Sequence, residues 1–285
     1  MRATFAIASN TLTDLTRQKV FYFILIFALI LIGSSVFMAR FSFQQELQIL
    51  KDISLGAMSI FSSLLAILAT ARLIPQDIED RTAYTILAKP VPRFEYVIGK
   101  LLGVLALLAI SIAAMSALFL ALLYAREQTL LSETMRQFAN APREQLENAL
   151  REIRDAGLKI DIVQVIALLF IKAGVLASLT LLVTTFATTN IFTVMTMMFV
   201  YFIGHLQATA REYWLQQRGG GWLTHVFLAF VALVFPDLQT FNRVDEIIAG
   251  HALAAGMFAQ TTLLGCFYIV VYTALATVMF YGKEL

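Results

Sequence analysis

Charged residues are scarce in this chain of 285 residues: Asp, Glu, Lys and Arg together make up only 14% of it, and 59% of its residues are hydrophobic. A soluble globular domain carries about 25% charged residues. The composition therefore excludes an ordinary soluble protein and indicates an integral membrane protein. The net charge of +2 adds little, because the charges are segregated by loop.

Cysteine is almost absent as well. Cys266 is the single cysteine and sits in an apolar run, so the chain can hold neither a disulfide framework nor a cysteine-based metal site. His205, His225 and His251 lie far apart and lack the spacing of metal ligands, and we interpret them as interfacial or packing residues. We expect no metal site on this chain.

Motifs of soluble catalysts are missing too. The glycine run at 219–221 is followed by Trp222, Leu223 and Thr224, so the lysine with which a P-loop reaches phosphates is absent. The sequence has no HExxH, no GxSxG and no paired-carboxylate motif. We therefore expect no catalytic residue and no cofactor on this chain, and no nucleic-acid partner.

Long apolar runs dominate the sequence instead. A helix needs about 20 apolar residues to cross a bilayer, and lipid offers the backbone no hydrogen-bond partner, so each run should be helical. A shorter run, Trp222–Phe235, is closed by Pro236 and Asp237, which favours a re-entrant or interfacial helix on the outer side. The runs that we expect to span the membrane are Phe21–Ala39, Ile53–Ile74, Leu101–Tyr124, Ile162–Thr185, Ile191–Gln207 and Gly256–Tyr281.

The segment before the first span, Ala3–Arg17, has the pattern of an amphipathic helix that lies on the membrane surface. An ordinary frayed N-terminus is the alternative. The residues expected on the apolar side are Phe5, Ala8, Leu12 and Leu15, and those expected on the polar side are Thr4, Thr13, Asp14 and Arg17.

A polar insert, Ala125–Asp161, separates the third and fourth spans. It predicts a helix at Thr129–Phe138 and a second helix that begins near Asn140 and Pro142 and ends at Gly157. The two helices could fold against each other or against an extracytoplasmic partner, or form only a solvated spacer. The chain as a whole, residues 1–285, is expected to be a single membrane domain that carries this helical insert.

Orientation follows from the rule that short cytoplasmic flanks are rich in Lys and Arg. With the N-terminus inside, the inner flanks are the denser ones, which places both termini in the cytoplasm and the insert outside. The basic residues of the inner segments are Arg2, Arg17, Lys19, Arg72, Arg81, Lys89, Arg93, Lys100 and Lys283.

Lys172 is the exception inside an apolar run. An intramembrane lysine usually faces a bundle interior or a cavity, which makes Lys172 a candidate for a translocation path. Snorkelling to the membrane surface is the alternative. Thr180 and Thr184 on the same predicted helix could line that path or simply form hydrogen bonds between helices.

The loop with the clearest sequence pattern is the densely charged stretch Gln76–Lys100. Charge is costly inside hydrocarbon, so this loop must lie outside it. It contains a charged helical opening, a Lys-Pro-x-Pro-Arg stop and a second helix start. Such a loop favours attachment to a soluble partner.

Three stretches of this loop carry a resemblance. Glu-Asp-Arg-Thr at 79–82, Leu-x-Lys-Pro-Val-x-Arg at 87–93 and Glu-Tyr-Val-Ile-Gly-Lys at 95–100 resemble the loop between the second and third spans of type-two ABC exporter permeases. These are the six-span membrane subunits of polysaccharide- and drug-exporter-like ABC transporters. The order of an interfacial helix, six spans and a re-entrant stretch before the last span also matches that family.

The resemblance implies a function. The loop would form a cytoplasmic coupling helix that docks on a separate ATPase subunit, which holds ATP and Mg. Two permease subunits, identical or homologous, would face each other in a bacterial inner membrane. The resemblance assigns docking to Glu79, Asp80, Arg81 and Thr82, and the bend into the third span to Lys89, Pro90 and Arg93.

Two other functions compete with an exporter permease. A non-transporting, ABC-coupled scaffold or mechanotransmitter would use the same loop, so the sequence does not separate it from a permease. A secondary transporter driven by an ion gradient would want buried acidic residues, and none of the six expected spans contains Asp or Glu. That absence counts against the second alternative.

Overall fold

The described part of the chain is helical throughout its regular structure. A computed structural model describes residues 2–40, 45–79, 92–138, 142–159, 161–187, 189–216, 235–244 and 254–281. The helices are α1 (Arg2–Thr16), α2 (Lys19–Arg40), α3 (Glu46–Ala71), α4 (Leu73–Glu79), α6 (Arg93–Gln137), α7 (Arg143–Ala156), α8 (Asp161–Phe186), α9 (Asn190–Gln216) and α12 (Ala255–Tyr281).

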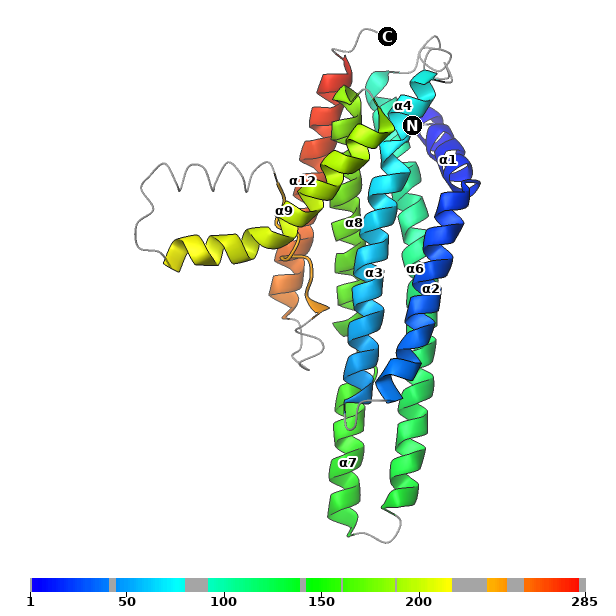
Figure 1. The fold of residues 1–285 in the computed structure, drawn as a ribbon, viewed down its shortest axis with the longest axis vertical. Coiled ribbons are helices and arrows are strands. Elements are labelled where there is room, and N and C mark those ends of the chain that lie inside the picture. The colour runs from blue at the N-terminus through cyan, green and yellow to red at the C-terminus, as the bar shows by residue number, and fades with distance from the viewer. Residues whose placement is uncertain are drawn as a thin grey trace.

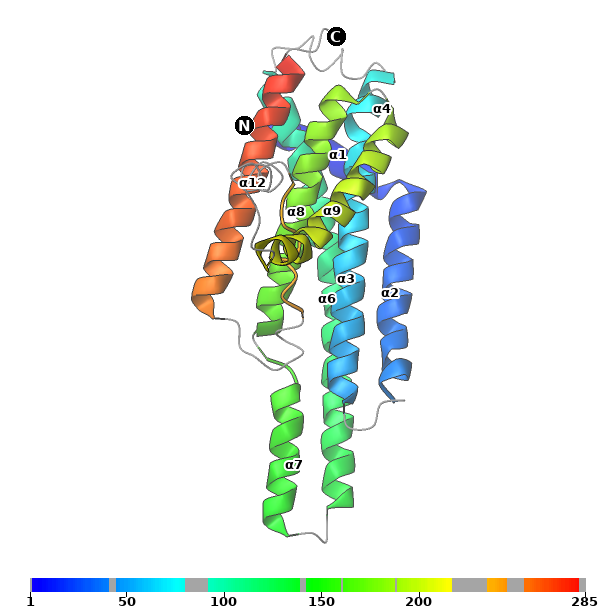
Figure 2. The ribbon, with the colours of Figure 1, turned by 60° about the vertical axis from the view of Figure 1, so that its left-hand side comes forward.

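Six helical segments of this part are long and apolar enough to cross a membrane. They contain α2, α3, α6, α8, α9 and α12. Successive ones alternate in direction; all lie roughly along the long axis except α9, which descends obliquely and turns away from the bundle in its second half (Figures 1 and 2). The start of α1 and the end of α12 therefore lie at one end of the molecule. The prediction of an all-α protein with six spanning helices is confirmed.

Helix α8 is the centre of the bundle. It packs against α12, α3 and α6, and more than half of its residues are buried, including Leu168, Val175 and Leu176. A helix that is apolar on all sides has no preferred outer face and is stable only when neighbours surround it or lipid does. Protein neighbours surround α8, whereas α2 and α12 leave large apolar side chains exposed on the surface of the chain.

Helix α1 packs along α6, and two glycines allow the close approach. A Cβ at Gly99 would lie 2.9 Å from Ile7 Cβ, and one at Gly103 would lie 2.6 Å from Thr11 Cβ. Small residues four apart let two helix backbones come this near.

The buried face of α1 agrees with the predicted one at Leu12, which packs against the core, and at Leu15, which is 2% exposed, but not at Phe5. Ile7 and Thr11 face α6, while Phe5 is 71% exposed. The prediction weighed only polarity, whereas the glycine groove of α6 accepts the threonine. The helix itself is confirmed within one residue at each end.

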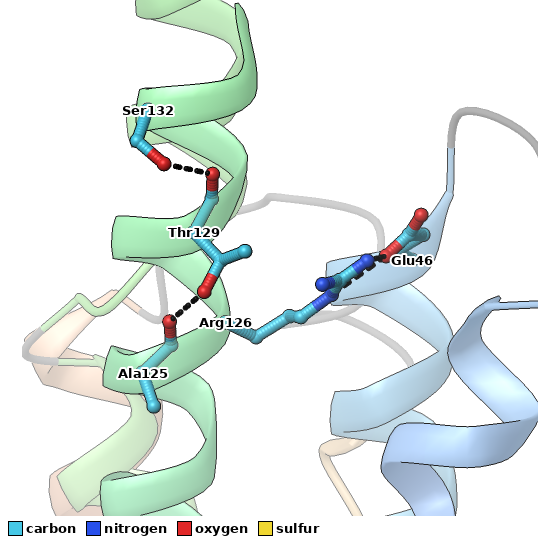
Figure 3. Close-up of polar contacts among 5 residues, drawn as sticks. All are labelled: Glu46, Ala125, Arg126, Thr129 and Ser132. Atoms are coloured by element: carbon cyan, nitrogen blue, oxygen red, sulfur yellow. Dashed lines mark hydrogen bonds and ion pairs between the residues drawn. The ribbon is translucent and has the colours of Figure 1, made fainter.

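The polar insert is a helical hairpin that projects from the bundle at the end opposite the termini (Figures 1 and 2). The helix predicted at Thr129–Phe138 is not separate: α6 continues without interruption to Gln137. The hydroxyls of Thr129 and Ser132 donate to the carbonyls of Ala125 and Thr129, at 2.9 Å and 2.8 Å, so they leave the helix regular (Figure 3).

The returning helix α7 begins and ends close to the predicted residues. It starts after Pro142, its last residue is Ala156, and Gly157 follows as predicted. A Cβ at Gly157 would lie 2.5 Å from the carboxyl carbon of Glu127. That carboxylate accepts a hydrogen bond from the Leu158 amide at 3.1 Å, so it holds the hairpin closed onto α6.

The predicted re-entrant run Trp222–Phe235 lies outside the described residues except for its last one, so it stays a prediction. The segment that follows, 235–244, is described and packs against membrane helices. The Leu238 amide donates to the Gly204 carbonyl of α9 at 3.1 Å, and the ring of Phe241 lies against Gly265 of α12. These contacts hold the irregular segment against α9 and α12.

Candidate functional site

Two places hold the residues that the sequence singled out: the charged end between α4 and α6, and a buried lysine in α8. At the charged end, α4 finishes at Glu79 and α6 begins at Arg93 after Pro92. These boundaries agree with the predicted helical opening and the stop before a second helix. The remaining sequence-predicted residues of this loop, which lie outside the described residues, are Asp80, Arg81, Thr82, Lys89 and Pro90.

Asp77 joins the two helices that flank this loop. Its carboxylate forms an ion pair with Lys100 Nζ of α6 at 2.6 Å and accepts a short hydrogen bond from the Tyr96 hydroxyl. Lys100 and Tyr96 are both buried. A buried charge is stable in such a place only when it is paired, so this contact fixes α4 against α6.

Arg93 ties the start of α6 to the end of the last span. Its Nη1 donates to the carbonyls of Phe280 and Tyr281, at 3.2 Å and 2.7 Å, and the guanidinium lies over the Tyr281 ring. The final carbonyls of a helix have no partner within that helix, and a cation there also complements the helix dipole. The Tyr96 ring stacks on Phe280 with centroids 5.5 Å apart.

The N-terminal helix reaches the same place. The Thr4 hydroxyl donates to the Glu95 carboxylate at 3.2 Å. Elements α1, α4, α6 and α12 therefore meet at the flanks of one loop. Sequence reasoning quoted Asp77, Tyr96 and Lys100 as part of the charged stretch but gave them no role. Their spacing carries no signal of pairing, because Asp77 and Lys100 are brought together only by the turn of the chain between two helices.

A polar cleft of about 510 Å³ opens beside this network. Helix α1 forms one wall, and α4 and the start of α6 form the other. The lining residues include the exposed side chains of Arg17, Arg72 and Gln76. This cleft thus exposes polar and charged side chains beside the flanks of the loop.

The second place surrounds Lys172, which is 0% exposed in the middle of α8. Its Nζ donates to Ser59 Oγ of α3 at 2.9 Å and lies 3.1 Å from His205 Nε2 of α9. The ammonium is also 5.8 Å from the centre of the Tyr201 ring. Lys172 therefore faces the interior of the chain, as an intramembrane charge is expected to do, and does not snorkel.

The hydrogen bonds select one form of the histidine. If Lys172 donates to Nε2, the proton of a neutral His205 lies on Nδ1, and Nδ1 is 2.9 Å from the Tyr201 carbonyl, which accepts it. Lys172 thus links three spanning helices through one ammonium group. Ser59 and His205 carried no role in the sequence analysis, since neither has a spacing relative to Lys172 that indicates contact.

The two candidate threonines are buried in the same helix. Thr180 and Thr184 are each 0% exposed, and their hydroxyls donate to carbonyls of α8 itself, of Leu176 and Leu181, both at 2.6 Å. Their hydroxyl protons are therefore already used within α8. Their role in a path remains a prediction.

The site offers no metal chemistry within the described residues, where no three His, Cys, Asp or Glu side chains lie close enough to hold an ion. Its polar contacts instead connect helices. Charged side chains fix the flanks of a polar loop, and a buried lysine links three spanning helices. The class of protein is thus a multi-pass helical membrane protein with an anchored, charged inter-helix loop.

Comparison with family models gives the family. The model described as "ABC-2 family transporter protein" matches residues 5–285, nearly the whole chain, and the chain belongs to that family. It is therefore a permease component of an ABC transporter, a membrane subunit that associates with an ATPase subunit. No curated protein matches the chain.

Proposed function

We propose that this chain is the transmembrane permease subunit of an ABC exporter, with the loop at 76–100 as the place where a separate ATPase docks. The observation that supports the proposal is the anchoring of both flanks of this loop. Asp77 on one flank is held by Lys100 and Tyr96, and Arg93 on the other is held by the end of α12.

The anchors explain how motion would be transmitted. When two ATPase subunits close on ATP and Mg, each pushes on the loop that it holds. A loose loop would absorb that displacement. A loop fixed to α4, α6 and α12 passes it to three helices of the bundle, and α8 contacts all three. Docking falls to Glu79, Asp80, Arg81 and Thr82, and Lys89, Pro90 and Arg93 redirect the chain into α6.

The buried lysine would limit how α3, α8 and α9 can move relative to one another. Lys172 holds α8 to α3 and α9 through Ser59 and His205. Separating these helices would leave an ammonium without partners in the membrane, which is costly. Helix rearrangement during export therefore either moves the three helices together or exchanges their partners, and a path that includes Thr180 and Thr184 opens only in the second case.

Orientation and assembly complete the proposal. Both termini and the docking loop lie in the cytoplasm of a bacterium, the α6–α7 hairpin lies outside the inner membrane, and a second permease subunit covers part of the exposed apolar surface. The charge density of the flanks supports this orientation, as does the structure's separation of the termini from the hairpin (Figure 1).

Purification of the protein from native membranes after lysine-directed cross-linking tests the proposal. We expect an ATPase subunit in the complex, with cross-links to Lys89, and two permease subunits per complex. Recovery of the chain without any ATPase under conditions that preserve other membrane complexes would contradict it.

The non-transporting scaffold remains the second candidate, because the projecting hairpin could transmit motion to an outer partner. The reconstituted complex separates the two. Stimulation of its ATPase activity by a compound that it also moves across the bilayer identifies a transporter. Stimulation by an extracytoplasmic protein, without movement of any compound, identifies a scaffold.

A further inference from the structure

A cavity of about 610 Å³ lies between the start of α3 and the α6–α7 hairpin, at the end of the molecule opposite the docking loop. We propose that it binds an amphipathic molecule with one acidic group, a carboxylate or a phosphate, whose acid pairs with Lys51. The cavity goes beyond the proposed function, because binding there requires neither the ATPase nor a transport direction.

Lys51 supplies the first observation. It lines the cavity, is only 3% exposed, and has no hydrogen-bond or ion-pair partner among the described residues. A buried ammonium is costly unless an anion or several acceptors meet it. An acidic ligand in this cavity would provide the missing partner.

The nearby carboxylates are already engaged. Glu46 accepts hydrogen bonds from Arg126, with Nε at 2.8 Å (Figure 3), and Asp155 pairs with Lys159 at 3.3 Å. Glu127 accepts the Leu158 amide. The charges that act on Lys51 are Lys159, of like sign, and Glu127, of opposite sign. Neither forms an ion pair with it.

The walls of the cavity account for the apolar part of the ligand. Helix α3 contributes Leu47, and the hairpin contributes apolar side chains from both of its helices, Leu130, Phe138, Ala149, Ile153 and Ala156. Pockets for small ligands have volumes of about 300–1,000 Å³ and combine such walls with a few polar groups. An inorganic anion alone would leave the apolar walls unmatched.

The rim limits the charge of the ligand. Glu152 lines the cavity from α7 and is exposed, so it would repel a second negative group near the opening. The Arg126–Glu46 contact holds α3 to the extended part of α6 and keeps the two walls together. The geometry therefore selects a single acid attached to an apolar chain or ring.

Isothermal titration of the purified full-length protein in phosphatidylcholine nanodiscs tests the inference, with empty nanodiscs subtracted. The probes are octanoate and octyl phosphate, which share the apolar chain and differ in the acid. Octanol, acetate and inorganic phosphate serve as probes that lack one half of the ligand. We expect saturable binding of at least one of the first two, and binding at least tenfold weaker for each of the last three.

Variants locate the site. Lys51→Met should weaken binding at least tenfold, while Arg151→Met, which removes an exposed cation of the same hairpin outside the cavity lining, should change it less than twofold. Ala149→Phe should also weaken binding by filling the cavity, and it retains Lys51 if the first variant does not fold. Gel filtration and thermal unfolding report folding.

Three results would overturn the inference. They are no saturable binding of either acid amphiphile, equal binding by folded Lys51→Met or Ala149→Phe, and equal binding of octanol or of the small anions. The first two reject the site, and the third rejects the ligand class. Loss of ATPase association leaves all these measurements unchanged, so failure of the proposed function would be seen separately.

Discussion

At the scale of single residues, two lysines lie where burial makes a charge costly, and each has polar partners. Lys172 has Ser59 and His205, and Lys100 has Asp77. Each pair joins helices that are distant in sequence. Such residues are expected to matter more for the relative position of helices than for the stability of any one helix.

Replacement of Lys172 tests this at the buried site. Lys172→Met retains the length of the side chain and removes the ammonium, so α8 loses its polar link to α3 and α9. We expect normal membrane insertion and expression, and at least about a threefold change in ATPase activity of the assembled complex. Ser59→Ala, which removes one acceptor, should shift activity in the same direction by less.

Lys159→Met is the matched control, since Lys159 is a lysine of the hairpin and its partner Asp155 is exposed. It should leave ATPase activity at the parental level. Parental activity in Lys172→Met, with insertion and assembly intact, would show that the buried cation has no role in function.

At the scale of elements, the helices could be predicted from the sequence, and their buried faces only in part. The apolar runs predicted all six spanning helices, because the bilayer fixes both their length and their hydrogen bonding. The predicted inward side of α1 is confirmed at Leu12 and Leu15, but the inward position of Thr11 was missed. Its position depends on Gly99 and Gly103 of a helix far along the chain, and a local pattern does not contain that information.

The hairpin shows the same limit. Pro142 and Gly157 were informative as helix boundaries, since proline restricts the backbone and glycine is a poor helix former. The continuous α6 was missed because the sequence becomes polar after Ala125 although the helix continues.

The cluster around Lys172 was predicted only in part. The burial of Lys172 follows from its place in an apolar run, whereas its contacts with Ser59 and His205 depend on how the helices pack.

Gly103 tests the docking of α1 on α6. A Cβ there would lie 2.6 Å from Thr11 Cβ and 2.9 Å from the Ala8 carbonyl, so Gly103→Ala must push the two helices apart. Overpacking of this kind costs about 1–3 kcal/mol. We expect a lower temperature of thermal unfolding in detergent and faster proteolysis of α1.

Gly33→Ala is the control for this prediction. Gly33 lies in α2, and a Cβ added there would meet no other atom within 4 Å, so alanine should be neutral or stabilise the helix by about 0.5–1 kcal/mol. Equal thermal unfolding of the two variants would mean that the close approach of α1 and α6 does not hold in the membrane.

At the scale of the whole molecule, the two ends have different tasks. One end gathers α1, α4 and the flanks of the charged loop at 76–100, and the other carries the hairpin (Figures 1 and 2). The cavity lined by Lys51 lies beside this hairpin. An even number of spans returns the chain to its starting side, so both termini are expected on the same side of the membrane.

Thiol labelling in intact cells tests the orientation in a Cys266→Ser background. Ser132 and Gln145 are exposed on the hairpin, and Glu79 is exposed at the end of α4. Ser132→Cys and Gln145→Cys should react with a membrane-impermeant reagent, and Glu79→Cys should react only after the cells are opened. The reverse pattern would invert the orientation.

The central claim is that the charged loop holds the ATPase, and charge reversal within it tests that claim most directly. The triple variant Glu79→Lys, Asp80→Lys, Arg81→Glu is compared with Glu144→Lys, Glu147→Lys, Arg151→Glu, which makes the same changes on exposed residues of α7. Single surface pairs contribute about 0–1 kcal/mol each, so only the combined change is expected to be clear.

The measurement is the dissociation constant between the purified ATPase subunit and each permease variant in nanodiscs. The account predicts binding at least about tenfold weaker for the loop variant, which corresponds to about 1.4 kcal/mol, and unchanged binding for the hairpin variant. Parental affinity in the loop variant, or an equal loss in both variants, would contradict the assignment of the loop as the docking site.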